Sequence, residues 1–137
     1  MKYLLDTCVV SDCINVRYGV AEHLLSLSPQ EIAVSSITVM EIEYGLWRNN
    51  AVRKKIQKPI NDFISSVHVL PFDEDDARKA AHIRFQLKEK GVPIGPYDYL
   101  LGATALRRSL IFVTSNTKEF SRIAHLKLED WRNLTAN

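Results

Sequence analysis

The chain has 137 residues, of which 46% are hydrophobic and 25% charged, and 18 Lys and Arg against 16 Asp and Glu leave a formal net charge of +2. This composition is typical of one folded domain and excludes a disordered chain. The longest unbroken apolar run, residues 110–113, is far shorter than the roughly 20 residues of a membrane helix, so we expect no membrane span. We also expect no secretory leader, and the near-neutral charge gives no sign of a nucleic-acid partner.

The two cysteines and four histidines lack the spacing of a metal site. Cys8 and Cys13 match neither a redox pair nor a zinc knuckle. We interpret them as free, buried thiols and expect a reducing, cytoplasmic environment.

Short apolar segments alternate with helical patterns along the chain. Strands are predicted at residues 3–5, 32–35, 67–70 and 110–113, with a weaker one at 126–128. Helical patterns cover residues 36–48, 74–90 and 97–109, and residues 46–66 have the apolar content of a helical hairpin. In the first of these helices, Met40, Tyr44 and Trp47 have the spacing of one apolar face.

This alternation predicts an α/β fold with a mostly parallel central sheet of four to five short strands flanked by helices. We treat residues 1–131 as a single domain and residues 132–137 as a short polar tail. Ligands of such sheets bind outside the carboxyl ends of the strands. Asp6 directly follows the first strand, and residues 114–116 follow the fourth, so this edge is the candidate site.

Each candidate side chain also has a purely structural interpretation. Asp6 suits the N-cap of the next helix, and Glu41 suits a capping box with Thr38. Asp98 suits the first turn of its helix, where an acid complements the helix dipole. Asn116 suits a turn, and Glu119 a solvated acid in a first helical turn.

The combination points to a metal site, because hard cations take several oxygen ligands from different segments. Gly45, one turn after Glu41, suggests a close approach to the backbone, and Gly102, one turn after Asp98, suggests tight packing. The consecutive acids at residues 73–76 point in different directions on a helix, so we interpret them as the acidic start of that helix, with Asp73 as its N-cap.

A series of segments follows in a recognisable order along the chain: Leu4-Leu5-Asp6-Thr7, residues 37–45, Asp98, and residues 101–105, 112–120 and 126–131. These segments, over roughly residues 2–131, resemble the PIN-domain family, and in particular VapC- and FitB-like toxin ribonucleases of type II toxin–antitoxin systems. Cys8 departs from the family, whose members commonly have Asn at that position.

The resemblance implies that Asp6, Glu41 and Asp98 are metal ligands for Mg²⁺ or Mn²⁺. The fourth position is either Asn116 or Glu119, and Thr7, Thr114 and Ser115 have supporting roles. The implied activity is endoribonuclease cleavage, in which the bound metal activates a water molecule against an RNA phosphodiester. The implied partners are a small DNA-binding antitoxin that docks on the hairpin at residues 46–66, and a second copy of the chain in a homodimer.

Arg48, Tyr97 and Arg107 are weaker candidates for contacts with RNA phosphates and unpaired bases. Solvated helix faces and core aromatics explain the same residues equally well. Two other functions stay open. One is a catalytically weak PIN-like module in a DNA-bound regulatory complex. The other is a haloacid-dehalogenase-like phosphatase, which needs a second Asp where this chain has Cys8.

Overall fold

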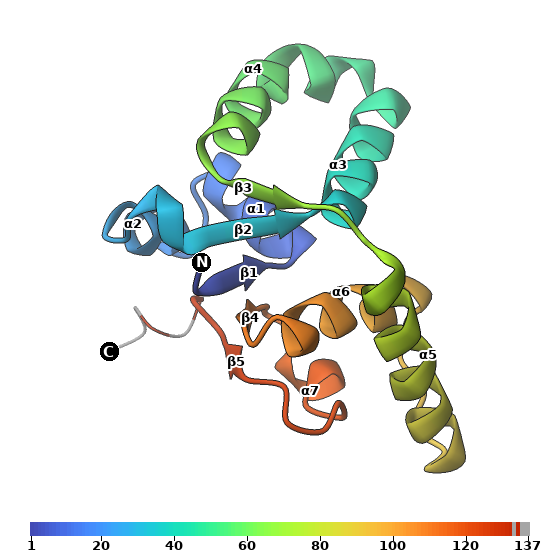
Figure 1. Cartoon of the computed structure of the whole chain (residues 1–137). Helices are drawn as coiled ribbons and strands as arrows, with labels where there is room; N and C mark the ends of the chain where they lie inside the picture. The colour runs from blue at the N-terminus through green and yellow to red at the C-terminus, as the bar shows by residue number, and fades with distance from the viewer. Residues whose placement is uncertain (133, 135–137) are drawn as a thin grey trace.

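The computed structural model describes residues 1–132 and 134. At its centre lies one five-stranded sheet in the order β3-β2-β1-β4-β5, and every neighbouring pair is parallel (Figure 1). The strands are β1 (Tyr3–Leu5), β2 (Ile32–Ser35), β3 (His68–Leu70), β4 (Ile111–Val113) and β5 (Leu128–Glu129). The predicted α/β fold is therefore confirmed, and the strand bounds differ from the predicted ones by two residues at most.

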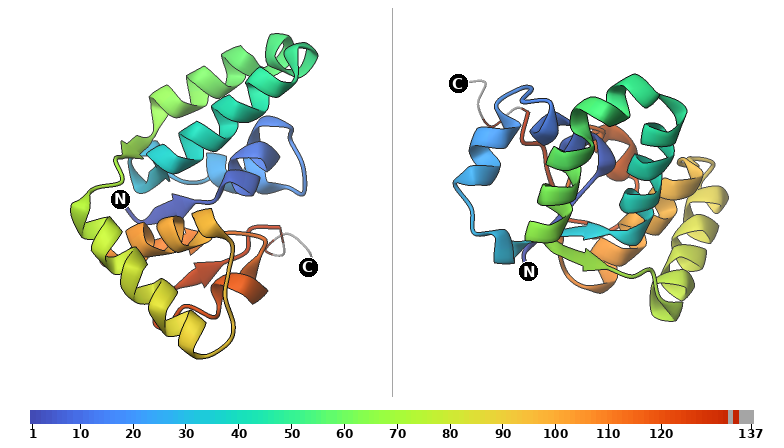
Figure 2. Two further views of the ribbon diagram at one scale, coloured as in Figure 1. Left: turned by 90° about the vertical axis from the view of Figure 1, so that its right-hand side faces the viewer. Right: turned by 90° about the horizontal axis from the view of Figure 1, so that it is seen from above.

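Helices cover both faces of the sheet (Figures 1 and 2). They are α1 (Thr7–Ile14), α2 (Val20–Leu25), α3 (Ser36–Arg48), α4 (Asn50–Ser66), α5 (Glu74–Glu89), α6 (Pro96–Arg107) and α7 (Thr117–Phe120), with a 3-10 turn at Pro29–Glu31. Among the described residues, no helix is long and apolar enough to cross a membrane.

The core has two layers, one on each face of the sheet. Leu4 of β1 packs into the layer of α5 and α6, whereas Tyr3 and Leu5 pack into the layer of α1 and α2, as expected from the alternation of side chains along a strand. In the second layer, the ring of buried Trp131 meets Tyr3 edge-on at 5.4 Å between centroids.

The end of the chain is attached to this second layer. Arg132, the first residue of the expected tail, donates from Nε to Asp12 Oδ2 at 2.7 Å and from Nη2 to Oδ1 at 3.0 Å. Of the remaining tail, residues 133 and 135–137 lie outside the described residues. Cys8 and Cys13 are free thiols, as predicted, but only Cys13 is fully buried.

Helices α3 and α4 lie side by side and project from the sheet as an arm, residues 36–66 (Figure 2). Asn49 ends α3 and is also the N-cap of α4, where its side chain accepts from Val52 N. The predicted apolar face of α3 is wrong: Tyr44 and Trp47 are 60% and 72% exposed, and Met40 is exposed too. Helix α3 carries a second stripe with helical spacing, Val39, Ile42 and Leu46, and this second stripe packs inward.

Candidate active site

Asp6 lies at the junction of β1 and α1. It is the N-cap of α1, as predicted, and its Oδ1 accepts from Thr7 N at 2.8 Å. Its Oδ2 accepts from the buried Thr114 hydroxyl, also at 2.8 Å, at the end of β4. Burial raises the pKa of Asp6, and the hydrogen bond from Thr114 is the strongest opposing influence. Capping fixes one oxygen of this carboxylate and a buried hydroxyl fixes the other, so its orientation is set by the start of α1 and by the end of β4.

Glu41 extends from α3 toward Asp6. The capping-box interpretation is wrong, because α3 begins at Ser36 and the hydroxyl of Ser35 caps it by accepting from Ile37 N at 3.0 Å. Glu41 Oε1 instead accepts from the Thr7 hydroxyl at 2.9 Å. Burial raises the pKa of Glu41, the Thr7 bond lowers it, and the charge of Asp6 raises it. Thr7 therefore joins α1 to α3 at the site.

Asp98 and Glu119 form a second pair of acids, on α6 and α7. Burial is the main cause that raises the pKa of Asp98 to about 8, followed by its hydrogen bond to Glu119 and the charges of Glu119, Asp6 and Glu41. The same hydrogen bond lowers the pKa of Glu119. The two acids are therefore coupled, and burial together with the neighbouring acids favours the protonated form of Asp98.

Backbone and amide donors hold Glu119 in place. Its Oε1 accepts from Gly95 N at 2.9 Å and its Oε2 from Asn116 Nδ2 at 2.6 Å. Gly95 also allows the close approach of Asp98, since a Cβ there would lie 3.0 Å from Asp98 Oδ2. The amide nitrogen of Asn116 is thus directed at Glu119.

The structure brings four predicted carboxylates, Asp6, Glu41, Asp98 and Glu119, within electrostatic range of one another. In the described part of the chain, however, no three acidic, imidazole or thiol side chains converge as ready ligands of one ion.

Cys8 borders the acidic cluster. Its Sγ lies 3.4 Å from Ser115 Oγ and 3.7 Å from Asp6 Oδ2. Burial and the neighbouring Asp6 charge raise the pKa of the thiol, so it stays protonated and donates to Asp6. In this chain a thiol thus provides a hydrogen bond to the Asp6 carboxylate.

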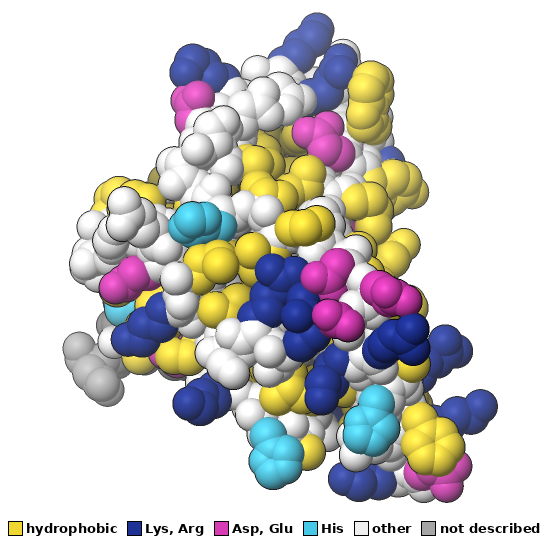
Figure 3. Space-filling model, viewed as in Figure 1, with side chains coloured by type: hydrophobic (Ala, Val, Ile, Leu, Met, Phe, Trp, Pro, Cys, Tyr) yellow, Lys and Arg dark blue, Asp and Glu magenta, His cyan; other side chains and the backbone are white. Residues whose placement is uncertain are grey.

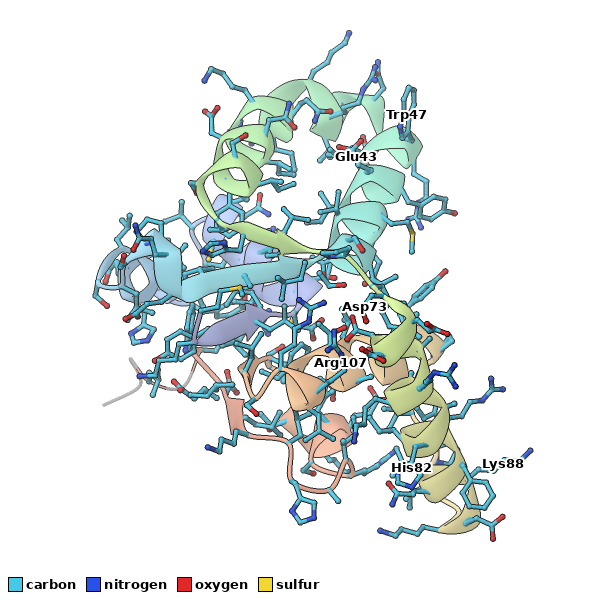
Figure 4. The ribbon with its side chains drawn as sticks, viewed as in Figure 1. Glu43, Trp47, Asp73, His82, Lys88 and Arg107 are labelled. Atoms are coloured by element: carbon cyan, nitrogen blue, oxygen red, sulfur yellow. The ribbon has the colours of Figure 1, made fainter. Side chains whose placement is uncertain are left out.

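The three weaker candidates for contacts with RNA lie in different environments in the structure. Arg107 donates from Nε to Asp76 at 2.6 Å and from Nη2 to Asp73 at 2.7 Å, so carboxylates already bind its guanidinium (Figure 4). Asp73 and Asp76 form a capping box at the start of α5, which confirms the structural interpretation of this acidic run. Tyr97 and Arg48 are exposed.

The two glycines that follow the acids behave differently. A Cβ on Gly102 would lie 2.5 Å from Ile123 Cδ1, which confirms the predicted tight packing. A Cβ on Gly45 would meet no described atom within 4 Å, so nothing in the described part of this chain makes the predicted close approach. Gly45 instead borders a groove of about 360 Å³ between α1, α3 and α4, which also reaches Thr7 and Glu41.

Comparison with known proteins places this geometry in a family. The sequence profile of the PIN domain matches residues 3–126. The chain is 36% identical to the tRNA(fMet)-specific endonuclease VapC of Salmonella typhimurium over 96% of this chain and 98% of that protein. It is 32% identical, with the same coverage, to ribonuclease VapC2 of Rickettsia felis.

Two solved structures share the fold over nearly their whole length. One is VapBC2 of Rickettsia felis bound to a promoter DNA fragment, with a TM-score of 0.87, 30% identity and coverage of 96% of this chain and 99% of that one. The other is DNA-bound VapBC of Salmonella typhimurium, with a TM-score of 0.86, 34% identity and coverage of 96% and 98%. The chain therefore belongs to the PIN domain family, in the branch that contains the VapC proteins.

Proposed function

We propose that this chain is the toxin of a type II toxin–antitoxin pair and acts as a metal-dependent endoribonuclease. The observation that carries the proposal is the cluster of Asp6, Glu41, Asp98 and Glu119, in which burial and the neighbouring acids together raise the pKa of Asp98. The names of the VapC relatives, ribonuclease and endonuclease, support the reaction class.

The donor set fits a hard divalent cation, Mg²⁺ or Mn²⁺, because carboxylate oxygens are the ligands these ions prefer. We assign Asp6, Glu41 and Asp98 as ligands, with Glu119 as the fourth acid. Such a cation supplies charge neutralisation and activation of water toward a phosphodiester. Because the pKa of Asp98 is raised to about 8, a cation bound there would compete with the proton of this carboxyl group.

The neighbouring polar residues orient these acids. Thr114 and Thr7 fix the Asp6 carboxylate, and the Thr7 hydroxyl also holds Glu41. Asn116 acts as a positioning residue for Glu119 rather than as a ligand, since its amide donates to that carboxylate. Ser115 supports Asp6 indirectly through Cys8.

The solved complexes named VapBC support a proposed antitoxin partner, in a cytoplasmic setting. The groove between α1, α3 and α4 suits a segment of that partner, because the apolar face of α4 lines it and Glu41 lies within it. A basic side chain inserted there would neutralise the acids and block the site. A homodimer is part of the same proposal. The phosphatase alternative and the catalytically weak module are not favoured by these relatives.

Cleavage of RNA by the purified full chain, freed of any partner, tests the proposal. Wild type is expected to cleave total RNA, with initiator tRNA as the first defined substrate, only when Mg²⁺ or Mn²⁺ is present. Asp98→Asn is expected to abolish cleavage and weaken metal binding while the fold is retained. Asp75→Asn is the matched control, because Asp75 is an exposed acid at the start of another helix. Absence of cleavage by wild type, or normal cleavage by Asp98→Asn, would overturn the proposal.

A further inference from the structure

The tip of the α3–α4 arm carries two exposed aromatic rings that the proposed active site does not use. Trp47 projects outward from α3 (Figure 4), and Tyr44 lies on the same helix. A guanidinium covers each ring: Arg48 Cζ lies 5.4 Å from the Tyr44 centroid, and Arg53 Cζ lies 4.9 Å from the Trp47 centroid. The two cations hold both rings in defined places.

The same segment concentrates positive charge. Residues 44–58 contain five Lys and Arg and no Asp or Glu, so this stretch carries +5 and the rest of the chain, from the total of +2, carries −3. Of these cations, Lys58 is paired with Asp62 at 2.8 Å. In Figure 3, dark-blue basic side chains gather at this end of the molecule beside yellow hydrophobic ones.

Helix α3 connects this surface to the site. Glu41 lies on the same helix, and the helical rise places Tyr44 about 4.5 Å and Arg48 about 10 Å farther along the axis. Arg48, seven residues on, projects to almost the same side as Glu41, because seven residues make about two turns. A short unpaired strand that leaves the acids can therefore follow α3 to the tip.

We propose that Tyr44, Trp47, Arg48 and Arg53 bind an unpaired segment of the RNA substrate, with bases stacked on the rings and phosphates on the guanidiniums. The inference rests on the proposed function. Aromatic rings interleaved with cations are the usual means of binding single-stranded nucleic acid without reading its sequence. A second copy of the chain fits less well, because a two-fold contact at the tip would bring the excess positive charge of residues 44–58 against itself.

Binding is measured with a labelled unpaired oligoribonucleotide and the full chain in an Asp98→Asn background, which prevents cleavage. Trp47→Ala is expected to weaken binding about 5- to 150-fold, the range measured for a lost base stack. Trp47→Phe is expected to keep most of the affinity, because it keeps a flat ring. Phe85→Ala, which removes another highly exposed aromatic, on α5, is the matched control and is expected to bind as the parent does.

Two further readouts separate stacking from a structural effect. RNA is expected to quench the fluorescence of Trp47, whereas Trp131 is only 1% exposed and out of reach. Arg53→Ala is expected to lower the slope of log affinity against log salt by about 0.7, the value for one phosphate contact on a single strand, and Trp47→Ala is expected to leave this slope unchanged.

Failure of RNA binding at the tip can be distinguished from failure of the proposed nuclease function. If the chain with an intact Asp98 cleaves RNA and Trp47→Ala leaves both cleavage and binding unchanged, the surface proposal is wrong and the nuclease stands. If Trp47→Ala converts a dimer to a monomer in sedimentation without changing RNA affinity, the tip is a protein interface and the proposal is overturned. If the intact chain does not cleave RNA at all, the proposed function itself fails.

Discussion

Replacement of Thr114 by Val tests how the site holds Asp6. Thr114 is fully buried, and its hydroxyl makes two hydrogen bonds: it donates to Asp6 Oδ2 at 2.8 Å and accepts from Asn116 N at 3.0 Å. Val has nearly the same shape but neither donates nor accepts. The variant thus removes the two bonds with little change in packing.

The bond to the carboxylate is charge-assisted, and such bonds contribute about 1.5–3 kcal/mol. With the Asn116 amide also left without its acceptor, the free energy of unfolding should fall by about 2–3 kcal/mol near neutral pH. Loss of a residue that orients a ligand typically lowers metal affinity by roughly 10- to 100-fold. We expect Thr114→Val to lower the affinity for Mg²⁺ and for Mn²⁺ by the same factor.

The stability loss should also depend on pH. The Thr114 bond lowers the pKa of Asp6 in the folded state, so its contribution is present where Asp6 is ionised and disappears as the pH falls through that pKa. The difference in unfolding free energy between wild type and variant should therefore be larger at about pH 8 than at about pH 4.

Denaturant unfolding at the two pH values and calorimetric metal titration measure these effects. Thr104→Val is the matched control, because Thr104 is also fully buried and donates to an aspartate, Asp76 Oδ2, at 3.1 Å, away from the site. It should lose stability and keep metal affinity. If Thr114→Val weakens metal binding no more than Thr104→Val does, the role assigned to Asp6 is wrong.

Three further predictions concern the rest of the molecule. Because the pKa of Asp98 is raised to about 8, metal binding there should displace a proton, and Mg²⁺ affinity should rise with pH up to that value. The free energy of unfolding of the metal-free chain should fall over the same pH interval. Equal Mg²⁺ affinities at about pH 6 and about pH 8 would contradict the raised pKa. Gly102→Ala should cost about 1–3 kcal/mol in thermal unfolding, and Ile123→Val, which removes the clashing Cδ1, should restore most of it. Asp12→Asn, which weakens the bidentate pair with Arg132, should cost about 1–3 kcal/mol and leave RNA cleavage unchanged.

The sequence was informative wherever short-range rules determine structure. Asp6 could be assigned both as an N-cap and as a site residue, because the end of a parallel strand and the start of the next helix coincide there. The acidic run at residues 73–76 was explained by the helix dipole alone, and the capping box of Asp73 and Asp76 agrees.

Long-range contacts bear on what the sequence left open. The sequence did not choose between Asn116 and Glu119 as the fourth position, and the assignment of Glu119 is a proposal supported by the amide of Gly95, 24 residues earlier, which donates to that carboxylate. The capping box at Thr38 and Glu41 failed for a local reason, since Ser35 ends β2 and also caps α3, so the helix starts earlier than that motif implies. Helical spacing likewise identified two apolar stripes on α3, and only packing against α1 and α4 selects the inner one.

An uneven distribution of charged residues along the chain explains its small net charge. With +5 at residues 44–58 and −3 elsewhere, the near-zero total is the sum of a basic stretch and a more acidic remainder that contains the four clustered carboxylates. A polyanion approaching the molecule is repelled by that cluster until a cation or a proton neutralises it, whereas the basic stretch attracts it at any stage. Under the two proposals made above, the basic stretch would attract RNA and the acids would carry the hydrolysis, so an overall charge near zero is compatible with a nuclease of this design.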